Sequence, residues 1–164
     1  MRTAIIGTGM QGSRYAAMIA SGNVKGMELA AMTRFREQYR ELLKTAIDNN
    51  TPVFQSADEL FEAVDGGSLM IDAVIITTPH LSHEQIALAA FRRGLHVLCD
   101  KPAGVTSSQA RRMDEAAKSC GCIYGMIFNQ CALAVNQKIH EIIESGVSLL
   151  METLYSQYSE AKYT

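Results

Sequence analysis

The stretch that decides the fold is Arg2-Thr3-Ala4-Ile5-Ile6-Gly7-Thr8-Gly9-Met10-Gln11-Gly12, near the start of this 164-residue chain. It opens with a short apolar run of the kind that forms a buried β-strand, and a helical pattern follows its glycines. The glycines match G-x-G-x-x-G, a pattern that carries weight when it lies between a strand and a helix. This stretch supplies that setting.

Each glycine of such a loop has its own task. The first permits a tight turn, the second lets the backbone approach a pyrophosphate, and the third allows the helix to pack closely on the strand. The N-terminus of the helix then faces the anion. The sequence therefore predicts a dinucleotide at this loop, held by Gly7, Thr8, Gly9, Met10, Gln11 and Gly12.

The loop has three other interpretations. A glycine-rich turn without a ligand stays open. A P-loop is excluded because Ser13 stands where that motif needs a lysine. A methyltransferase loop is the weakest of them, because no carboxylate stands near the end of the second predicted strand to hold a ribose.

Outward from this loop, short apolar runs alternate with helical patterns. Strands are predicted at residues 2–6, 27–33, 53–54, 71–77, 95–99 and 122–128, and the main helices at 10–20, 35–47, 82–93 and around 135–143. Capping boxes, Ser56 with Glu59 and Thr106 with Gln109, mark the starts of two more helices. This alternation predicts an α/β fold, a doubly wound and mainly parallel sheet between two helical layers, the Rossmann fold.

Composition narrows the possible partners. Fifteen basic and seventeen acidic residues give a formal net charge of −2, which lacks the basic surplus of a nucleic-acid binder. No apolar run reaches the roughly 18 residues of a membrane span. We expect a cytoplasmic protein whose partners are small molecules, without nucleic acid or membrane.

The cysteines give no sign of a metal site. They show neither a C-x-x-C pair nor the spacing of zinc ligands, and they are Cys99, Cys120, Cys122 and Cys131. We expect reduced, mostly buried thiols and no bound metal.

The end of the second strand indicates the cofactor. NAD-binding domains usually place an acidic residue there for the ribose 2′-hydroxyl, whereas this chain has Thr33-Arg34. A guanidinium with a neighbouring hydroxyl can donate charge-assisted hydrogen bonds to a 2′-phosphate. NADP(H) is therefore expected in preference to NAD(H). The alternative is that Arg34 is a solvated charge at a helix start.

Two further segments carry a family resemblance. They are Ile76-Thr77-Thr78-Pro79-His80-Leu81-Ser82-His83 and Gly94-Leu95-His96-Val97-Leu98-Cys99-Asp100-Lys101-Pro102. With the glycine loop, they resemble the N-terminal half of the glucose-fructose oxidoreductase/inositol dehydrogenase (Gfo/Idh/MocA) family, which typically shows T-P-x-x-x-H after the fourth strand and E-K-P after the fifth. The resemblance covers about residues 1–146 and implies NAD(P)-dependent hydride transfer on a sugar, polyol or related small molecule.

The resemblance also implies roles for single residues. Lys101 matches the lysine beside the nicotinamide and the reacting oxygen, although it can also be a solvated lysine. Thr77, Thr78, Pro79 and His83 match the segment along the nicotinamide, and His83 can equally cap its helix. The remaining expected cofactor contacts are Asp100, Pro102 and Asn129.

Two residues depart from the family pattern. Asp100 replaces the usual glutamate, which keeps the charge and shortens its reach. Phe128-Asn129-Gln130 resembles an F-N-Q-R segment, but Cys131 stands where an arginine often sits, so a substrate-anion contact loses support there.

The end of the sequence sets the last expectation. We expect a Rossmann domain at residues 1–146 and, at 147–164, a tail without the family pattern: a first strand of the family's second domain, a packing tail, or a frameshifted end. Two function classes follow: an oxidoreductase cut short at its cofactor domain, with little or no activity alone, or a non-catalytic NADP(H)-binding module or sensor. A homodimer is the assembly we expect.

Overall fold

The structure, a computed structural model, describes residues 1–147 and divides into two compact units. The first unit spans Met1–Ile127 and the second begins at Phe128.

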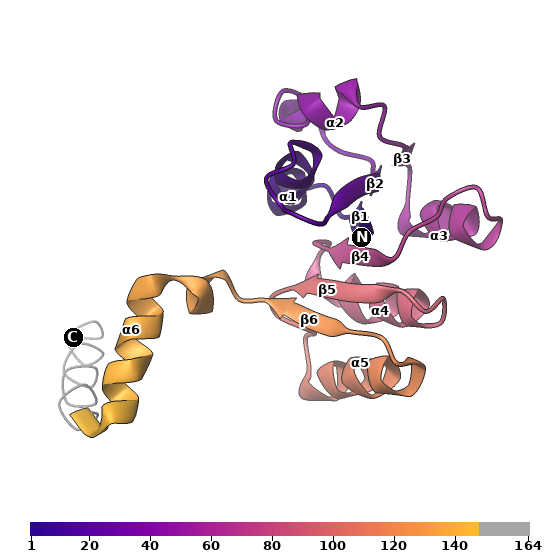
Figure 1. Cartoon of the computed structure of the whole chain (residues 1–164). Helices are drawn as coiled ribbons and strands as arrows, with labels where there is room; N and C mark the ends of the chain where they lie inside the picture. The colour runs from indigo at the N-terminus through magenta and orange to yellow at the C-terminus, as the bar shows by residue number, and fades with distance from the viewer. Residues whose placement is uncertain (148–164) are drawn as a thin grey trace, which may run out of the picture. The chain divides into compact units, whose positions relative to one another are not determined.

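The first unit is built on one parallel sheet of six strands in the order β3-β2-β1-β4-β5-β6 (Figure 1). The chain starts at the centre of the sheet, winds to one edge and returns to build the other half. This confirms the doubly wound Rossmann fold predicted from the sequence. The strands are β1 (Arg2–Ile6), β2 (Glu28–Thr33), β3 (Val53–Phe54), β4 (Ala73–Ile76), β5 (His96–Asp100) and β6 (Tyr124–Ile127).

Helices cover both faces of this sheet, because neighbouring strand residues point to opposite sides. Ile5 belongs to one core cluster with residues of α1 and α2, and Ile6 belongs to the other with residues of α3, α4 and α5. The helices are α1 (Met10–Ala20), α2 (Lys44–Asp48), α3 (Ala57–Asp65), α4 (His83–Phe91) and α5 (Ser107–Cys120). Two cores separated by the sheet are what the near-continuous apolar strands require.

The helix predicted at residues 35–47 is wrong in extent. The chain there forms the 3-10 turn η1 (Glu37–Tyr39) and then the short α2. The reason is that strand pairing runs past β2: the Arg34 N–H donates to the Phe54 carbonyl at 2.7 Å, and Arg36 is still extended. A tertiary bond therefore overrides the local helical pattern.

The predicted caps form with one change. Thr106 and Gln109 make the full capping box at the start of α5. The Ser56 hydroxyl accepts from the Glu59 N–H at 3.1 Å, but the Glu59 carboxylate accepts from the Gln55 N–H, one residue earlier than a capping box requires.

Close contacts between the end of β1, the start of α1 and the loop after β4 fix the glycine loop. The Thr77 hydroxyl donates to the Gly7 carbonyl at 2.6 Å, and Gly7 has a φ of 100°. A Cβ placed on Gly12 would lie 2.2 Å from the Gly7 carbonyl oxygen and 2.5 Å from Thr77 Oγ1. The third glycine is therefore required by packing, as the motif predicts.

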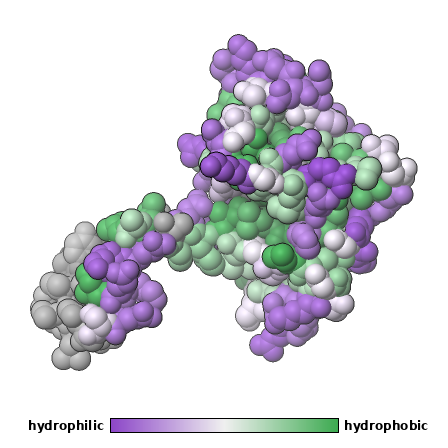
Figure 2. Space-filling view, viewed as in Figure 1, coloured by the Kyte–Doolittle hydropathy of each residue, from purple (hydrophilic) through white to green (hydrophobic). Residues whose placement is uncertain are grey.

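Part of one sheet face stays apolar and uncovered within the first unit. A purely apolar hollow there combines side chains of α1 with Ile75, Leu98 and Ile127 from three neighbouring strands. Figure 2 shows apolar side chains gathered over this part of the sheet. Among residues 1–147, no helix is long and apolar enough to cross a membrane.

The second unit contains the turn η3 (Asn129–Ala132), the predicted helix as α6 (Ala134–Ile142), and a wider helical turn, η4 (Ile143–Val147). Helical structure therefore extends beyond the helix predicted around residues 135–143, because η4 runs on to Val147. The domain boundary at residue 146 stays a prediction, and the tail predicted at residues 147–164 lies outside the described residues except for Val147.

The expectation of mostly buried thiols is wrong. Cys99 is buried in β5, whereas Cys120 and Cys131 are exposed and Cys122 is half-buried. Burial, and secondarily the charge of Asp100, raises the pKa of Cys99 to about 12, so this thiol is inert.

We predict that alanine destabilises the fold strongly at one glycine of the loop and little at another. Gly12→Ala forces the start of α1 away from the Gly7 carbonyl and should lower the free energy of unfolding by about 1–3 kcal/mol. Gly9→Ala, whose Cβ meets no atom within 4 Å, should change it by less than about 1 kcal/mol. Urea unfolding of both variants measures this. Equal losses in the two would contradict the packing role of Gly12.

A second prediction concerns Asp72, which anchors the start of β1. Hydrogen bonds from the Arg2 side chain, and then from the Arg2 N–H, lower the pKa of Asp72 from 3.8 to about 2. The bridge is therefore fully stabilising above about pH 4 and is lost as the pH falls through 2. Asp72→Asn should melt below the wild type at pH 7, and the gap should close towards pH 2.

Asp114→Asn is the matched control for this prediction, because Asp114 forms an exposed pair with Lys118 within one helix. It should change the melting temperature little at any pH. A gap between Asp72→Asn and the wild type that stays constant from pH 7 to pH 2 would show that the Asp72 charge does not stabilise the fold.

Candidate cofactor-binding site

A groove of about 540 Å³ runs along the carboxyl ends of the strands. It lies where the chain reverses its direction of winding, between β1 and β4, which is where open α/β sheets bind ligands. Its lining comes from the loops after β1, β2 and β4 and from the end of β5: Gly7, Thr8, Gly9, Met10, Gln11, Arg34, Arg36, Tyr39, Thr77, Thr78, Pro79, His80 and Asp100.

The glycine loop forms one wall of this groove and fits a pyrophosphate. Gly9 caps α1 without any side-chain hydrogen bond, and the first turn of α1 carries no acidic residue. The first N–H groups of a helix have no carbonyl partner within it, so here they are free for an anion. The open space beside Gly9 leaves room for phosphate oxygens.

Buried threonines hold this loop in place. The Gly7 N–H donates to Thr33 Oγ1 at 2.9 Å, and the Thr8 hydroxyl lies within hydrogen-bonding distance of the carbonyls of Thr33 and Arg34. Thr8 reaches the groove, but Thr33 is buried and does not line it. Thr33 therefore supports the loop, and its predicted contact with the cofactor is not seen in this geometry.

Positive charge gathers at the end of β2. Arg34 and Arg36 are exposed and line the groove, and neither guanidinium has an ion-pair partner among residues 1–147. Glu37, the nearest carboxylate in sequence, is bonded to Arg40, which lowers the pKa of Glu37. The groove thus carries two available cations where NAD-binding domains carry an acid.

Arg36, Tyr39 and His80 line the groove but were missed by the sequence reasoning. The signal for Arg36 was present: in an extended chain, residues two apart point to the same side, so Arg36 follows Arg34. Tyr39 and His80 lie on 3-10 turns, whose side-chain directions no period in the sequence specified.

The predicted catalytic lysine lies next to the groove but does not line it. Lys101 is exposed, and its ammonium has no ion-pair partner within the described part of the chain. Its N–H donates to the Asp100 carboxylate at 2.9 Å, and the Lys101–Pro102 peptide is cis. Asp100 itself reaches the groove.

His83 differs from both of its predicted roles. Its ring is completely buried, so it does not line the groove. It makes no helix cap either: Nε2 lies 2.8 Å from the Thr78 carbonyl and Nδ1 lies 2.9 Å from the Pro102 carbonyl.

The remaining predictions concern Asn129 and metal binding. Asn129 belongs to the second unit, so its contact with the cofactor stays a prediction. Among residues 1–147, no cluster of three or more His, Cys, Asp or Glu side chains is able to hold a metal ion.

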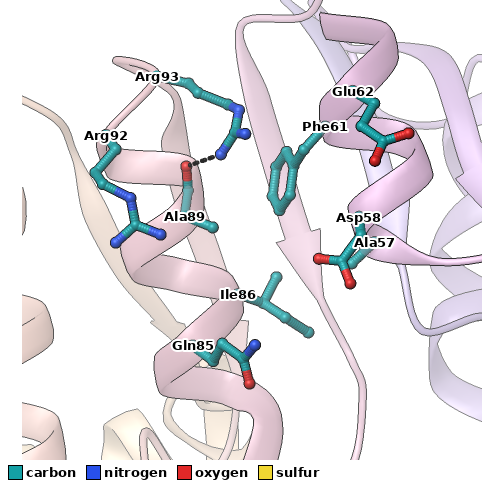
Figure 3. Close-up of a pocket in the computed structure, with 9 residues that line it drawn as sticks. All are labelled: Ala57, Asp58, Phe61, Glu62, Gln85, Ile86, Ala89, Arg92 and Arg93. Atoms are coloured by element: carbon teal, nitrogen blue, oxygen red, sulfur yellow. Dashed lines mark hydrogen bonds between the residues drawn. The ribbon is translucent and has the colours of Figure 1, made fainter. Parts of the chain in front are cut away.

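A separate groove of about 310 Å³ lies between α3 and α4 (Figure 3). Arg93 closes one side of it, since its guanidinium donates to Asp65 and to the Ala89 carbonyl and stacks 4.6 Å above the Phe61 ring. It shares no residue with the glycine-loop groove. One of its two arginines, Arg93, is already paired, and the carboxylates of Asp58 and Glu62 also line it (Figure 3), so it offers no comparable anion cradle.

Comparison with curated proteins gives relatives of one kind. The chain is 32% identical over 130 residues to the uncharacterized oxidoreductase YdgJ of Escherichia coli, covering 79% of this chain and 35% of that protein. It is 29% identical over 121 residues to an inositol 2-dehydrogenase of Agrobacterium fabrum, covering 74% and 34%. The chain thus spans about a third of the length of these relatives.

Solved structures share the fold. Scyllo-inositol dehydrogenase from Lactobacillus casei, with bound NAD(H) and scyllo-inositol, superposes with a TM-score of 0.74 at 21% identity, over 89% of this chain and 41% of that one. An NAD-binding protein from Listeria innocua gives 0.70 at 26% identity, over 88% and 40%.

The family model for the oxidoreductase family with an NAD-binding Rossmann fold (GFO_IDH_MocA) matches residues 1–128, which are the residues that build the sheet and the groove. The chain belongs to the Gfo/Idh/MocA oxidoreductase family and contains its N-terminal nucleotide-binding domain.

Proposed function

We propose that this chain binds NADP(H) in the glycine-loop groove. We also propose that it serves as the cofactor half of an oxidoreductase that transfers hydride between the nicotinamide and a hydroxyl or carbonyl carbon of a sugar or polyol. The observation that carries the proposal is the pair of available arginines, Arg34 and Arg36, at the end of β2. The sugar and polyol class comes from the names of the relatives.

The preference for the phosphorylated cofactor rests on charge. A 2′-phosphate carries negative charge that a carboxylate would repel, and a guanidinium donates paired hydrogen bonds to it. Arg34 and Arg36 both reach the groove, while Arg40 is occupied by Glu37. The NAD(H) in the Lactobacillus casei structure belongs to a protein only 21% identical, so the choice depends on this chain's own residues.

The chain's own groups can then be assigned tasks. The N–H groups at the start of α1 bind the pyrophosphate, and Thr77, Thr78 and Pro79 line the groove beyond it. The nicotinamide, when bound, supplies the hydride acceptor or donor. Lys101 is able to hold or release the proton of the reacting oxygen, because its ammonium is not engaged in an ion pair within residues 1–147.

A second candidate function is a non-catalytic NADP(H)-binding module. One observation favours it: Lys101 does not line the groove. The two candidates predict the same binding and differ in turnover. A cytoplasmic location and a homodimer stay predictions.

The cofactor prediction is that the chain binds NADPH more tightly than NADH. Arg34→Ala should weaken NADPH by roughly 10- to 150-fold, because a charge-assisted hydrogen bond contributes about 1.5–3 kcal/mol, and should leave NADH nearly unchanged. Fluorescence titration of both cofactors measures this. Arg111→Ala is the matched control, since Arg111 is exposed on α5 and does not line the groove. Equal affinities in the wild type would end the case for NADP(H).

The turnover prediction concerns the isolated chain. It should bind NADPH, yet with NADP⁺ as the hydride acceptor it should oxidise sugars, inositols and polyols slowly or not at all. Holding the reacting carbon at the cofactor can supply about 7–11 kcal/mol of the barrier reduction, and one open groove cannot provide that positioning. Lys101→Ala should keep NADPH affinity within about twofold, because an exposed ammonium outside the groove adds little to cofactor binding. Reduced-cofactor absorbance measures turnover beside the titration.

The outcomes separate the candidates. Robust turnover that Lys101→Ala abolishes would reject the non-catalytic module. Loss of NADPH binding in Lys101→Ala would reject the role assigned to this lysine.

A further inference from the structure

We propose that His83 is a positioning residue that ties the Lys101–Pro102 turn to the groove wall at Thr78. A ligand that binds in the groove therefore changes the backbone position at Lys101 through this link. The inference rests on the proposed function in one respect, namely that Lys101 acts at the cofactor.

The ring of His83 bridges two loops that lie far apart in the sequence. Nε2 lies 2.8 Å from the carbonyl of Thr78, five residues earlier, and Nδ1 lies 2.9 Å from the carbonyl of Pro102, nineteen residues later. The side chain is completely buried, so water does not compete for either contact. A buried polar ring is costly unless it is bonded, and these two carbonyls are the partners that it has.

The bridge extends a set of contacts that begins at the glycine loop. The Thr77 hydroxyl donates to the Gly7 carbonyl, and Thr78 follows it in the groove wall. The Thr78 carbonyl contacts His83, and His83 contacts the carbonyl of Pro102, the residue after Lys101. A shift of the groove wall on binding therefore has a direct mechanical route to the lysine.

The two links can be separated chemically. Both partners of the ring are acceptors, and a neutral imidazole carries one N–H, so it donates one bond, whereas an imidazolium donates both. An asparagine amide lies near the position of Nδ1 and a glutamine amide near that of Nε2. His83→Asn therefore keeps the Pro102 link, His83→Gln keeps the Thr78 link, and His83→Phe fills the space without either.

The first test needs no cofactor. The Ala103 N–H belongs to the same peptide group as the Pro102 carbonyl, so its exchange reports how firmly that peptide is held. Amide hydrogen exchange of the whole chain, followed by NMR, should show the Ala103 amide exchanging about tenfold faster in His83→Phe, because that peptide loses one buried hydrogen bond. His83→Asn should restore slow exchange and His83→Gln should not. The Ile5 amide, in the central strand, reports the intact fold. Unchanged exchange at Ala103 in His83→Phe would overturn the proposal.

The second test follows the coupling with 2′-phospho-ADP-ribose, which fills the groove but has no nicotinamide ring to touch Lys101. In the wild type, amide shifts should appear at Gly9 and Gln11 and also at Ala103, whereas a shift at Lys101 is not diagnostic, because its N–H donates to Asp100, which lines the groove directly. In His83→Phe, the glycine-loop shifts should remain and the Ala103 shift should be lost. A shift at Ala103 that survives the substitution would overturn the bridge. Shifts absent from the glycine loop of the wild type would instead overturn the proposed function.

Discussion

The site depends on the close approach of three stretches of backbone: the turn at Gly7, the first turn of α1 at Gly12, and the loop at Thr77. A methyl group on Gly12 would lie only 2.2 Å from the Gly7 carbonyl oxygen, far inside van der Waals contact, so the helix can start this close to the sheet only without a side chain there. This closeness aims the N-terminus of α1 across the groove. It also places the Thr77 hydroxyl on Gly7, which joins the first and fourth strands at the point where the ligand is expected.

The parallel sheet turns this local constraint into a continuous wall. Because β1 pairs with β2 on one side and with β4 on the other, the residues that follow these strands share one edge. Arg34 and Arg36 stand at one end of the groove, and His80 and Asp100 line it beyond the glycine loop. In the proposed function, Arg34 and Arg36 would hold a 2′-phosphate, the N-terminus of α1 would hold the pyrophosphate, and Asp100 and Lys101 would lie at the reacting end.

Local patterns predicted the fold and the core of the site, and long-range bonds explain what they missed. The glycine loop and the Thr106 cap are set by residues within one turn of each other, so both are visible in the sequence. The helix at 35–47 failed because the bond between Arg34 and Phe54 spans twenty residues. The place of His83 depends on Pro102, nineteen residues away, so a contact with the cofactor and a buried bridge could not be told apart from the sequence.

A crystal structure of the chain with NADPH tests the central claim most directly, namely that the glycine-loop groove is the cofactor site. We expect the pyrophosphate against the N–H groups at the start of α1, the 2′-phosphate within hydrogen-bonding distance of Arg34 or Arg36, and the nicotinamide directed towards Asp100 and Lys101. NADPH bound between α3 and α4, or a groove left empty at saturating cofactor, would contradict it.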